Sequence, residues 1–307
     1  MTNTTASVSA KSVVHYNACP VCGSEQIKLF SPVKDYSISG EVFEVMECIS
    51  CSVRFTQNAP SQEEIGPYYK AEHYISHSDS NKGLINRLYQ KVRHVTVRKK
   101  ANLIEEITNK HEGEVLDVGC GTGYFLAEMK SRGWTAEGLE PDPDARTLAA
   151  SVNNIQSSDI SHLFEIRAGS KDAVTLWHVL EHVHQLHDYM KRFKEILAPD
   201  GKLVIAVPNY TSYDSRHYGT FWAAYDVPRH LYHFSPKSLK ILAERHGMQV
   251  DSLHPMWYDS FYVSMLSEKY KKGSMVKAGI TGLISNFRTF FNKEQCSSLI
   301  YVLSVKI

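Results

Sequence analysis

Three glycines behind a carboxylate form the part of this chain best suited to bind a small molecule. Residues 115–123 read Val-Leu-Asp-Val-Gly-Cys-Gly-Thr-Gly, and a helical pattern begins at Tyr124. A strand that enters a helix through a glycine turn offers backbone N–H groups and a helix N-terminus to a ligand. Tyr124 stands where a dinucleotide-binding fingerprint needs glycine, and the Gly-Lys-Ser/Thr of a phosphate loop is absent. The turn formed by Gly119, Gly121 and Gly123, with Asp117 ahead of it, therefore predicts a ligand other than a pyrophosphate.

A second carboxylate, Glu140, closes the next strand-like run at 134–141. It follows the glycine turn by about 20 residues, the spacing at which a carboxylate at a strand end binds the hydroxyls of a ribose. The alternative is that Glu140 caps the following helix, together with Asp142 and Asp144 in its first turn. We favour the ribose interpretation because of the neighbouring glycine turn.

Another predicted strand, at 172–177, runs into the segment His178-Val179-Leu180-Glu181-His182. A helix over 185–197, a Pro-Asp-Gly turn and a strand over 202–207, closed by Pro208-Asn209, follow. Together these motifs resemble those of class I S-adenosylmethionine-dependent methyltransferases, among them the O-methyltransferases of ubiquinone biosynthesis, over residues 95–255. The resemblance implies S-adenosylmethionine as cofactor, with its ammonium group near Asp117. The cofactor-binding residues expected are Asp117, Gly119, Gly121, Gly123, Glu140, Asp159 and His178.

His178 is the first candidate for a catalytic group, because it ends the strand beside which the transferred methyl should lie. An unperturbed imidazole changes protonation near neutral pH, so His178 could remove a proton from the acceptor or orient it. The alternative is a histidine that only packs against the cofactor.

Glu181 and His182 raise the question of a divalent metal. Ubiquinone-type methyltransferases carry Glu-x-x-Glu-His for such a metal, but here His178 replaces the first Glu. Because magnesium prefers oxygen ligands, this departure weakens the metal interpretation. We expect Glu181 and His182 to cap and pack the following helix instead.

The segment 209–234 follows the fifth strand, and we interpret it as a substrate lid. Simple solvated loops are rarely so rich in aromatic, histidine and arginine side chains. Its residues Tyr225, Arg229, His230 and His233 could hold hydroxyls or a phosphate, and the candidates that join His178 as catalytic residues are Tyr225, His230 and His233. The alternative is a buried His/Tyr network that packs the lid.

Four cysteines stand in two Cys-x-x-Cys pairs, Cys19 with Cys22 and Cys48 with Cys51. Each pair can present two thiolates to one tetrahedral ion, and Pro20 and Gly23 suit a tight knuckle. We predict a structural zinc ribbon over residues 15–57, held by Cys19, Cys22, Cys48 and Cys51. A closed four-sulfur site leaves no position for a reacting water, so we assign it no catalysis. Free thiols or a redox pair are the alternatives.

Length and charge limit the remaining classes. A chain of 307 residues has room for one catalytic domain and a small accessory module. A net charge of +1 gives no overall field toward nucleic acid, so an RNA partner is not expected. The start of the chain lacks a basic, apolar signal peptide, and no run of about 18 apolar residues predicts a membrane span. We expect a reducing, cytoplasmic setting.

Cations precede the predicted catalytic core: Arg87, Lys91, Arg93, Arg98, Lys99 and Lys100. Such a run is usually a solvated helix face, but it could meet an anionic acceptor. Predicted helices at 261–270 and 276–291 pack on the core by default, with a dimer face or a membrane contact as alternatives.

These patterns predict an α/β fold with a doubly wound, mostly parallel seven-stranded sheet and an antiparallel last strand at 298–305. We expect a disordered tail at 1–14, the zinc ribbon at 15–57, a linker and N-terminal helices at 58–110, and the methyltransferase domain at 111–307. The predicted function is methyl transfer from S-adenosylmethionine to a small molecule, for example a sugar or cell-envelope intermediate. The alternatives are an RNA methyltransferase that reads RNA with its zinc ribbon, and a non-catalytic cofactor-binding module.

Overall fold

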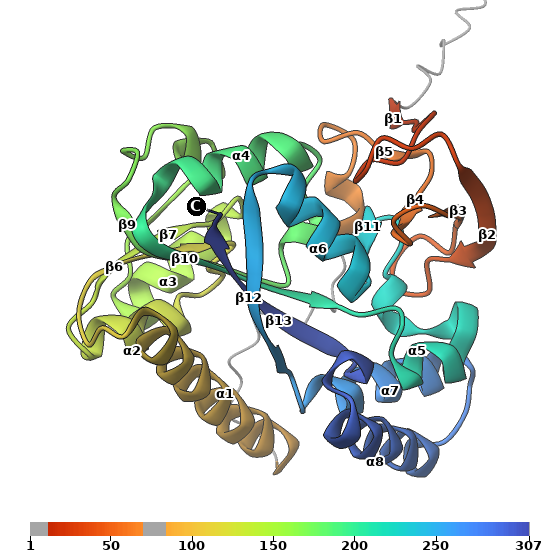
Figure 1. Ribbon diagram of the computed structural model, residues 1–307. Coiled ribbons are helices and arrows are strands. Elements are labelled where there is room, and N and C mark those ends of the chain that lie inside the picture. The colour runs from red at the N-terminus through yellow and green to blue at the C-terminus, as the bar shows by residue number, and fades with distance from the viewer. Residues whose placement is uncertain (1–11, 70–83, 307) are drawn as a thin grey trace, which may run out of the picture.

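The computed structural model describes residues 12–69 and 84–306, without the side chains of residues 84–91. Its main sheet has seven strands in the order β12-β13-β10-β9-β6-β7-β8 (Figure 1). Strands β6 to β10 pair in parallel, and β13 is antiparallel to both of its neighbours, β10 and β12. The predicted mostly parallel sheet with an antiparallel last strand is therefore confirmed. The strands are β6 (Glu114–Val118), β7 (Thr135–Leu139), β8 (Ser157–Ser158), β9 (Lys171–Trp177), β10 (Leu197–Pro208), β12 (Met248–Pro255) and β13 (Ser298–Val305).

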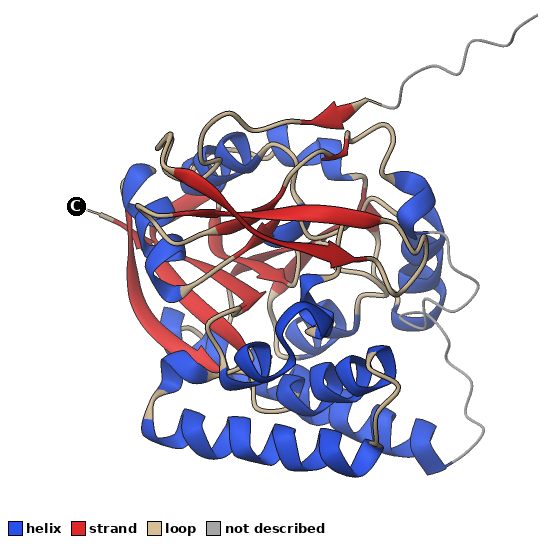
Figure 2. Ribbon diagram, turned by 90° about the vertical axis from the view of Figure 1, so that its right-hand side faces the viewer, coloured by secondary structure: helices blue, strands red, loops and turns tan. Residues whose placement is uncertain are grey.

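Helices cover both faces of this sheet (Figure 2). Successive strand residues point to opposite faces, so Val115 and Val204 pack with α1 and α2, while Leu116 and Ile205 pack with α4 and α6. Burial on both faces explains why these strands read as continuous apolar runs. The helices are α1 (Leu84–Thr108), α2 (Tyr124–Ser131), α3 (Pro143–Asn153), α4 (Leu186–Ile196), α5 (Tyr213–Tyr218), α6 (Pro236–Arg245), α7 (Asp259–Tyr270) and α8 (Met275–Phe291).

A second sheet of four strands lies beside the first, in the order β11-β4-β3-β2. Three of its strands come from the cysteine-rich segment: β2 (Ile27–Lys34), β3 (Val42–Cys48) and β4 (Arg54–Thr56). The fourth, β11 (Tyr232–His233), comes from the predicted lid and pairs antiparallel with β4. The cysteine-rich segment is thus part of the same structure as the lid, and its Cys48 and Phe55 share a core with Leu231 and Leu299.

Several segments differ from their predictions. Val13 and Val14, expected in a disordered tail, form β1 and pair with β5 (Ala59–Pro60) in the expected linker. Residues 1–11 and 70–83 of the predicted tail and linker lie outside the described residues. The lid is built around α5 and two short 3-10 helices, Gly219–Phe221 and Ala223–Tyr225, and most of its side chains are buried. Within residues 12–69 and 84–306, we find no helix with the length and hydropathy needed to cross a bilayer.

Candidate active site

The predicted cofactor-binding side chains meet at one edge of the main sheet. Asp117 lies in β6. The residues that directly follow β7, β8 and β9 are Glu140, Asp159 and His178, respectively. These four strands are direct neighbours in parallel pairing, so their carboxyl ends lie together. This edge of an open α/β sheet is where ligands bind as a rule.

The glycine turn closes against Glu140. The backbone N–H of Gly121 donates to Glu140 Oε2 at 2.8 Å, and that of Asp142 donates to Oε1 at 3.0 Å. Gly119 has φ +70°, and a Cβ there would lie 2.5 Å from a methyl of Val179, so this position requires glycine. Gly121, at φ +53°, faces open space. The turn therefore leaves a backbone surface that a ligand can approach closely.

Asp117 and Lys100 face each other across this edge. Asp117 is buried and accepts a hydrogen bond from Thr175 Oγ1 at 2.6 Å. Burial raises the pKa of Asp117 to about 7, although Thr175 and Lys100 act in the other direction. The Lys100 ammonium lies 4.2 Å from the ring centre of Trp177, at the end of β9. Burial lowers the pKa of Lys100 to about 8, against the attraction of Asp117 and Asp259.

In the sequence, Lys100 stands only within a run of cations that predicts a solvated helix face. A signal was present, because Lys100 shares a helical face with Val97, Ala101 and Ile104, of which Ala101 and Ile104 are fully buried. A lysine within an apolar stripe indicates an ammonium that is partly withdrawn from water.

His178 adopts a left-handed backbone conformation, φ +61°, which is uncommon for non-glycine residues. Its Nε2 lies 3.0 Å from Asp259 Oδ2, and its Nδ1 lies 3.4 Å from Glu181 Oε1. Burial alone would lower the pKa of His178, but the carboxylates of Asp259 and Glu181 outweigh it and raise the pKa to about 10. His178 is then an imidazolium at neutral pH, which favours an orienting role over that of a base. Asp259, the first residue of α7, belongs to no sequence motif and was missed.

A cluster of Glu181, His182 and His230 lies behind His178, with one ligand atom from each within 4.8 Å of the others. Glu181 is fully buried, and apart from the ion-pair contact with His178 at 3.4 Å its carboxylate oxygens have no hydrogen-bond partner among the described residues. His182 Nδ1 lies 3.0 Å from the carbonyl oxygen of Arg229, and His230 Nδ1 lies 2.9 Å from that of Ala224. N–H donation from both Nδ1 atoms leaves both Nε2 atoms as acceptors. The lid thus adds an imidazole that could hold a metal with Glu181 and His182, a combination more suited to zinc than to magnesium.

The remaining lid residues contact the second sheet. Tyr225 accepts a hydrogen bond from Arg54 of β4 at 2.6 Å, and His233 Nε2 lies 3.3 Å from Thr56 Oγ1. Burial holds the pKa of His233 well below its usual range, so its imidazole is neutral. The structure thus places Tyr225 and His233, two of the predicted catalytic residues, in the junction between lid and second sheet, the buried network we gave as the alternative.

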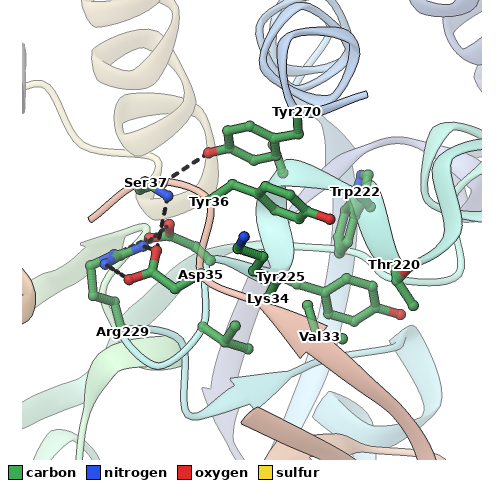
Figure 3. Close-up of a pocket in the computed structure, with 13 residues that line it drawn as sticks. Val33, Lys34, Asp35, Tyr36, Ser37, Thr220, Trp222, Tyr225, Arg229 and Tyr270 are labelled. Carbon is green, nitrogen blue, oxygen red and sulfur yellow. Dashed lines mark hydrogen bonds and ion pairs between the residues drawn. The ribbon is translucent and has the colours of Figure 1, made fainter. Parts of the chain in front are cut away.

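Arg229 is likewise engaged inside the protein. Its guanidinium lies 3.0 Å from Asp35 and 2.6 Å from Asp226, and its side chain is fully buried. Figure 3 shows Arg229 beside Asp35, with Tyr36 and Tyr270 stacked nearby. The cavity at this junction has a volume of about 10 Å³, enough for one water molecule at most. Arg229 is therefore not presented to a phosphate in this structure.

The four predicted metal-binding thiols converge. Cys19 Sγ lies 3.5 Å from Cys51 Sγ, Cys22 Sγ lies 3.5 Å from Cys48 Sγ, and the four sulfurs all lie within 4.8 Å of one another. A tetrahedral zinc with Zn–S bonds of about 2.3 Å needs sulfurs about 3.8 Å apart. The N–H groups of Cys22 and Cys51 point at the sulfurs of Cys19 and Cys48, at 3.4 and 3.5 Å. The geometry fits one zinc ion.

Comparisons with known proteins identify the family to which the chain is similar. A family model described as a methyltransferase domain matches residues 89–253, more than half of the chain. The chain is 22% identical over 211 residues to the ubiquinone biosynthesis O-methyltransferase of Rickettsia bellii, which covers 65% of this chain and 86% of that protein. It is 26% identical over 182 residues to the mitochondrial ubiquinone biosynthesis O-methyltransferase of Homo sapiens, covering 52% of this chain and 49% of that one. A solved SAM-dependent methyltransferase from Archaeoglobus fulgidus is similar at 20% identity and a TM-score of 0.48, over 69% of this chain and 93% of that chain.

Proposed function

The chain belongs to the family of methyltransferase domains and is an S-adenosylmethionine-dependent methyltransferase, and on that premise we propose that it methylates a hydroxyl group of a small anionic acceptor. The proposal of oxygen as the methylated atom draws on the O-methyltransferases that the chain resembles. A sugar or cell-envelope intermediate stays a prediction from the sequence.

One observation carries the anionic character of the acceptor. Three cations of α1 lie on aromatic rings: Arg93 is 3.9 Å from the ring centre of Tyr124, Lys99 is 5.3 Å from that of Tyr258, and Lys100 is 4.2 Å from that of Trp177. Tyr124 begins α2 beside the glycine turn, Trp177 ends β9, and Tyr258 precedes Asp259. The helix α1 therefore brings positive charge to the edge where the cofactor residues meet, which supports an anionic acceptor over a purely solvated face.

The residues at the sheet edge fit the cofactor. Glu140 can accept hydrogen bonds from the two ribose hydroxyls, Asp117 can attract the ammonium group, and the open Gly121 allows close approach of the amino-acid portion. Asp159, at the end of β8, is partly exposed and can receive a donor from the base. When bound, S-adenosylmethionine supplies a methyl carbon attached to a positively charged sulfur.

We assign the protein's part of the reaction to Lys100 and His178. Lys100, when neutral, can accept the proton of the acceptor hydroxyl. His178, held by Asp259 and Glu181, is a positioning residue that keeps its positive charge close to the acceptor's negative charge. Near pH 8 both roles are compatible.

The cofactor assignment is tested by isothermal titration of S-adenosylhomocysteine into wild type and Glu140→Gln. Glutamine keeps one acceptor oxygen, so the change should cost about one hydrogen bond to a charged group, about 1.5–3 kcal/mol, and weaken binding roughly 10- to 150-fold. Asp144→Asn, an exposed carboxylate in the first turn of α3, is the matched control. Wild-type affinity in Glu140→Gln would remove Glu140 from the cofactor site.

The acceptor assignment is tested by S-adenosylhomocysteine release with paired compounds, such as a dihydroxybenzoate and its uncharged amide, or a nucleotide sugar and the free sugar. The charged member of a productive pair should have the lower KM. Equal KM values for charged and uncharged members would overturn the anionic acceptor while leaving the cofactor site intact.

A further inference from the structure

The amphipathic character of α8 is reversed relative to a helix that packs on a soluble core. Its buried face consists of small residues, and its exposed face carries the large apolar ones, among them Phe287, Phe290 and Phe291, which are 67, 78 and 74% exposed. The buried positions are Ala278, Thr281, Gly282, Ser285 and Thr289. Helices of soluble domains normally place their large apolar side chains inward. The sequence-based expectation that this helix packs on the core is thus met only by its small residues.

The exposed apolar surface extends from α8 onto α7. Along α8 it includes Met275, Val276, Ile280, Leu283, Ile284, Phe287, Phe290 and Phe291. From α7 and the two residues before it, it includes Trp257, Tyr258, Phe261, Tyr262 and Met265. The two helices pack together at the periphery of the molecule (Figure 1), with Ser260 donating to Asn286 at 2.9 Å. An apolar surface of this extent marks an interaction site. We call it the α7–α8 face.

The segment that carries this face has an excess of positive charge. Residues 269–293 contain the exposed cations Lys269, Lys271, Lys272, Lys277, Arg288 and Lys293 and no acidic residue, and a single exposed acid, Glu294, follows. Phenylalanines on one side of a helix, with lysine and arginine at its borders, are typical of helices that lie in the interfacial layer of a membrane. Lysines and arginines next to the inserted side chains bind anionic phospholipid headgroups.

Other occupants fit the face less well. A second copy would bring six cations against six cations across a two-fold axis, with no acidic partner in the same segment. Residues 1–11 and 70–83 of this chain contain few large apolar residues, namely Met1, Val8, Tyr74 and Ile75, too few to cover the face.

We propose that the α7–α8 face docks on the surface of an anionic phospholipid membrane, with the phenylalanines of α8 in the interfacial layer. Asp259, the first residue of α7, contacts His178 at the active edge. Docking therefore holds the active site close to the lipid surface. This inference does not depend on the acceptor or on the catalytic roles proposed above.

The test is co-sedimentation of the full chain with vesicles of phosphatidylcholine alone or of equal parts phosphatidylcholine and phosphatidylglycerol. Wild type should bind the anionic vesicles, and added salt should weaken this binding. The triple variant Phe287→Ser, Phe290→Ser, Phe291→Ser and the double variant Lys271→Glu, Lys272→Glu should each lose about tenfold or more in partitioning. Val152→Ser, an exposed apolar residue of α3, is the matched control and should bind as wild type does.

Thermal unfolding and S-adenosylhomocysteine affinity establish that each variant is folded. If the triple phenylalanine variant does not fold, the double lysine variant still tests the proposal. Absence of vesicle binding at low salt would overturn the proposal. Equal binding to vesicles of phosphatidylcholine alone would overturn the claim that docking requires an anionic surface. A wild-type dimer in light scattering that the triple variant converts to a monomer would assign the face to a second copy instead.

Discussion

At the scale of single residues, Lys100 and His178 lie at the same edge of the sheet, yet their surroundings shift their protonation in opposite directions. Burial lowers the pKa of Lys100 to about 8, whereas two carboxylates raise the pKa of His178 to about 10 in spite of its burial. Between pH 8 and pH 10, Lys100 is mainly neutral and can take up a proton, whereas His178 is already protonated and cannot. The lysine is therefore the better general base, although a histidine at a strand end is the more obvious candidate from sequence.

Lys100→Met should reduce kcat by about 10²- to 10⁴-fold, the usual effect of removing a general base. Wild-type kcat should rise with pH up to about 8, because deprotonation of Lys100 produces the active form, and the variant should lack this rise. Arg98→Met is the matched control, since Arg98 is an exposed cation of the same helix. The measurement is kcat between pH 6 and 9.5, and a Lys100→Met enzyme with wild-type kcat would return the base to another group.

His178 makes a prediction about stability. Its pKa in the folded state, about 10, lies above the value of about 6.5 expected in the unfolded chain. Its ion pairs therefore stabilise the folded state fully below about pH 6.5. This stabilisation declines as the pH rises toward 10 and is absent above about pH 10. The difference in Tm between wild type and His178→Gln should shrink across that window, while groups common to both proteins cancel. A difference that is constant from pH 6 to 10 would contradict the ion pairs with Asp259 and Glu181.

At the scale of elements, the position of α1 determines which of its cations lie at the active edge. Lys99 lies over Tyr258 at the active edge, whereas Arg98, its neighbour in sequence, is exposed and points elsewhere around the helix. Lys99→Glu should raise KM for an anionic acceptor roughly 5- to 30-fold, because reversing a charge a few ångströms from an anion costs about 1–2 kcal/mol in water. The value of kcat should change little, which is the signature of lost uniform binding. Arg98→Glu is the control, and equal effects of the two reversals would reduce α1 to a general electrostatic surface.

The elements also show where sequence patterns suffice. Strands with their own apolar run, such as β6 and β9, were predicted to within one residue, because burial on both faces leaves a continuous signal. The strand β10 ends as predicted but begins five residues earlier, at Leu197, and includes the predicted Pro-Asp-Gly turn. The strand β8 consists of Ser157 and Ser158 and was missed, since only its pairing with β7 makes it a strand. The strand β11 was missed for the same reason, because it depends on β4.

The candidate site also contains residues that a sequence motif predicts and residues that only the fold brings together. Asp117, the glycine turn and Glu140 follow from short-range spacing, and the structure places them together. Asp259 and Lys100 come from elements without a motif, so only the folded chain brings them to His178 and Asp117. The aromatic and charged residues of the lid suggested substrate contacts, but partners far away in sequence, such as Asp35 for Arg229, bury them.

At the scale of the whole molecule, the cysteine cluster is connected to the active edge through hydrogen bonds of the lid. The N–H of Thr56, in β4, donates to the carbonyl of Leu231 at 2.9 Å, and the N–H of Leu231 donates to the carbonyl of Glu181 at 2.8 Å. Glu181 in turn faces His178. The strand β4 begins three residues after Cys51, so the cluster, β4, the lid and His178 form one continuous arrangement.

Removing one thiolate should therefore affect catalysis as well as stability. Cys22→Ser should lose one equivalent of zinc relative to wild type and should lower Tm, because metal binding contributes directly to the folding of so small a module. The comparison with wild type isolates this site from any metal held by Glu181, His182 and His230. Cys296→Ser, which removes a buried thiol outside the cluster, is the control.

The expected kinetic result of Cys22→Ser is a fall in kcat with little change in affinity for S-adenosylhomocysteine. The reason is geometric: the lid contacts Glu181, which faces His178. Glu140, the proposed ribose ligand, and the glycine turn are held by their own strands β7 and β6. Metal analysis, isothermal titration and turnover on the same preparation separate the two effects. Freshly purified wild type without zinc would remove the metal from this arrangement, and a zinc-free Cys22→Ser with unchanged kcat would show that the second sheet stabilises the fold without acting on the active edge.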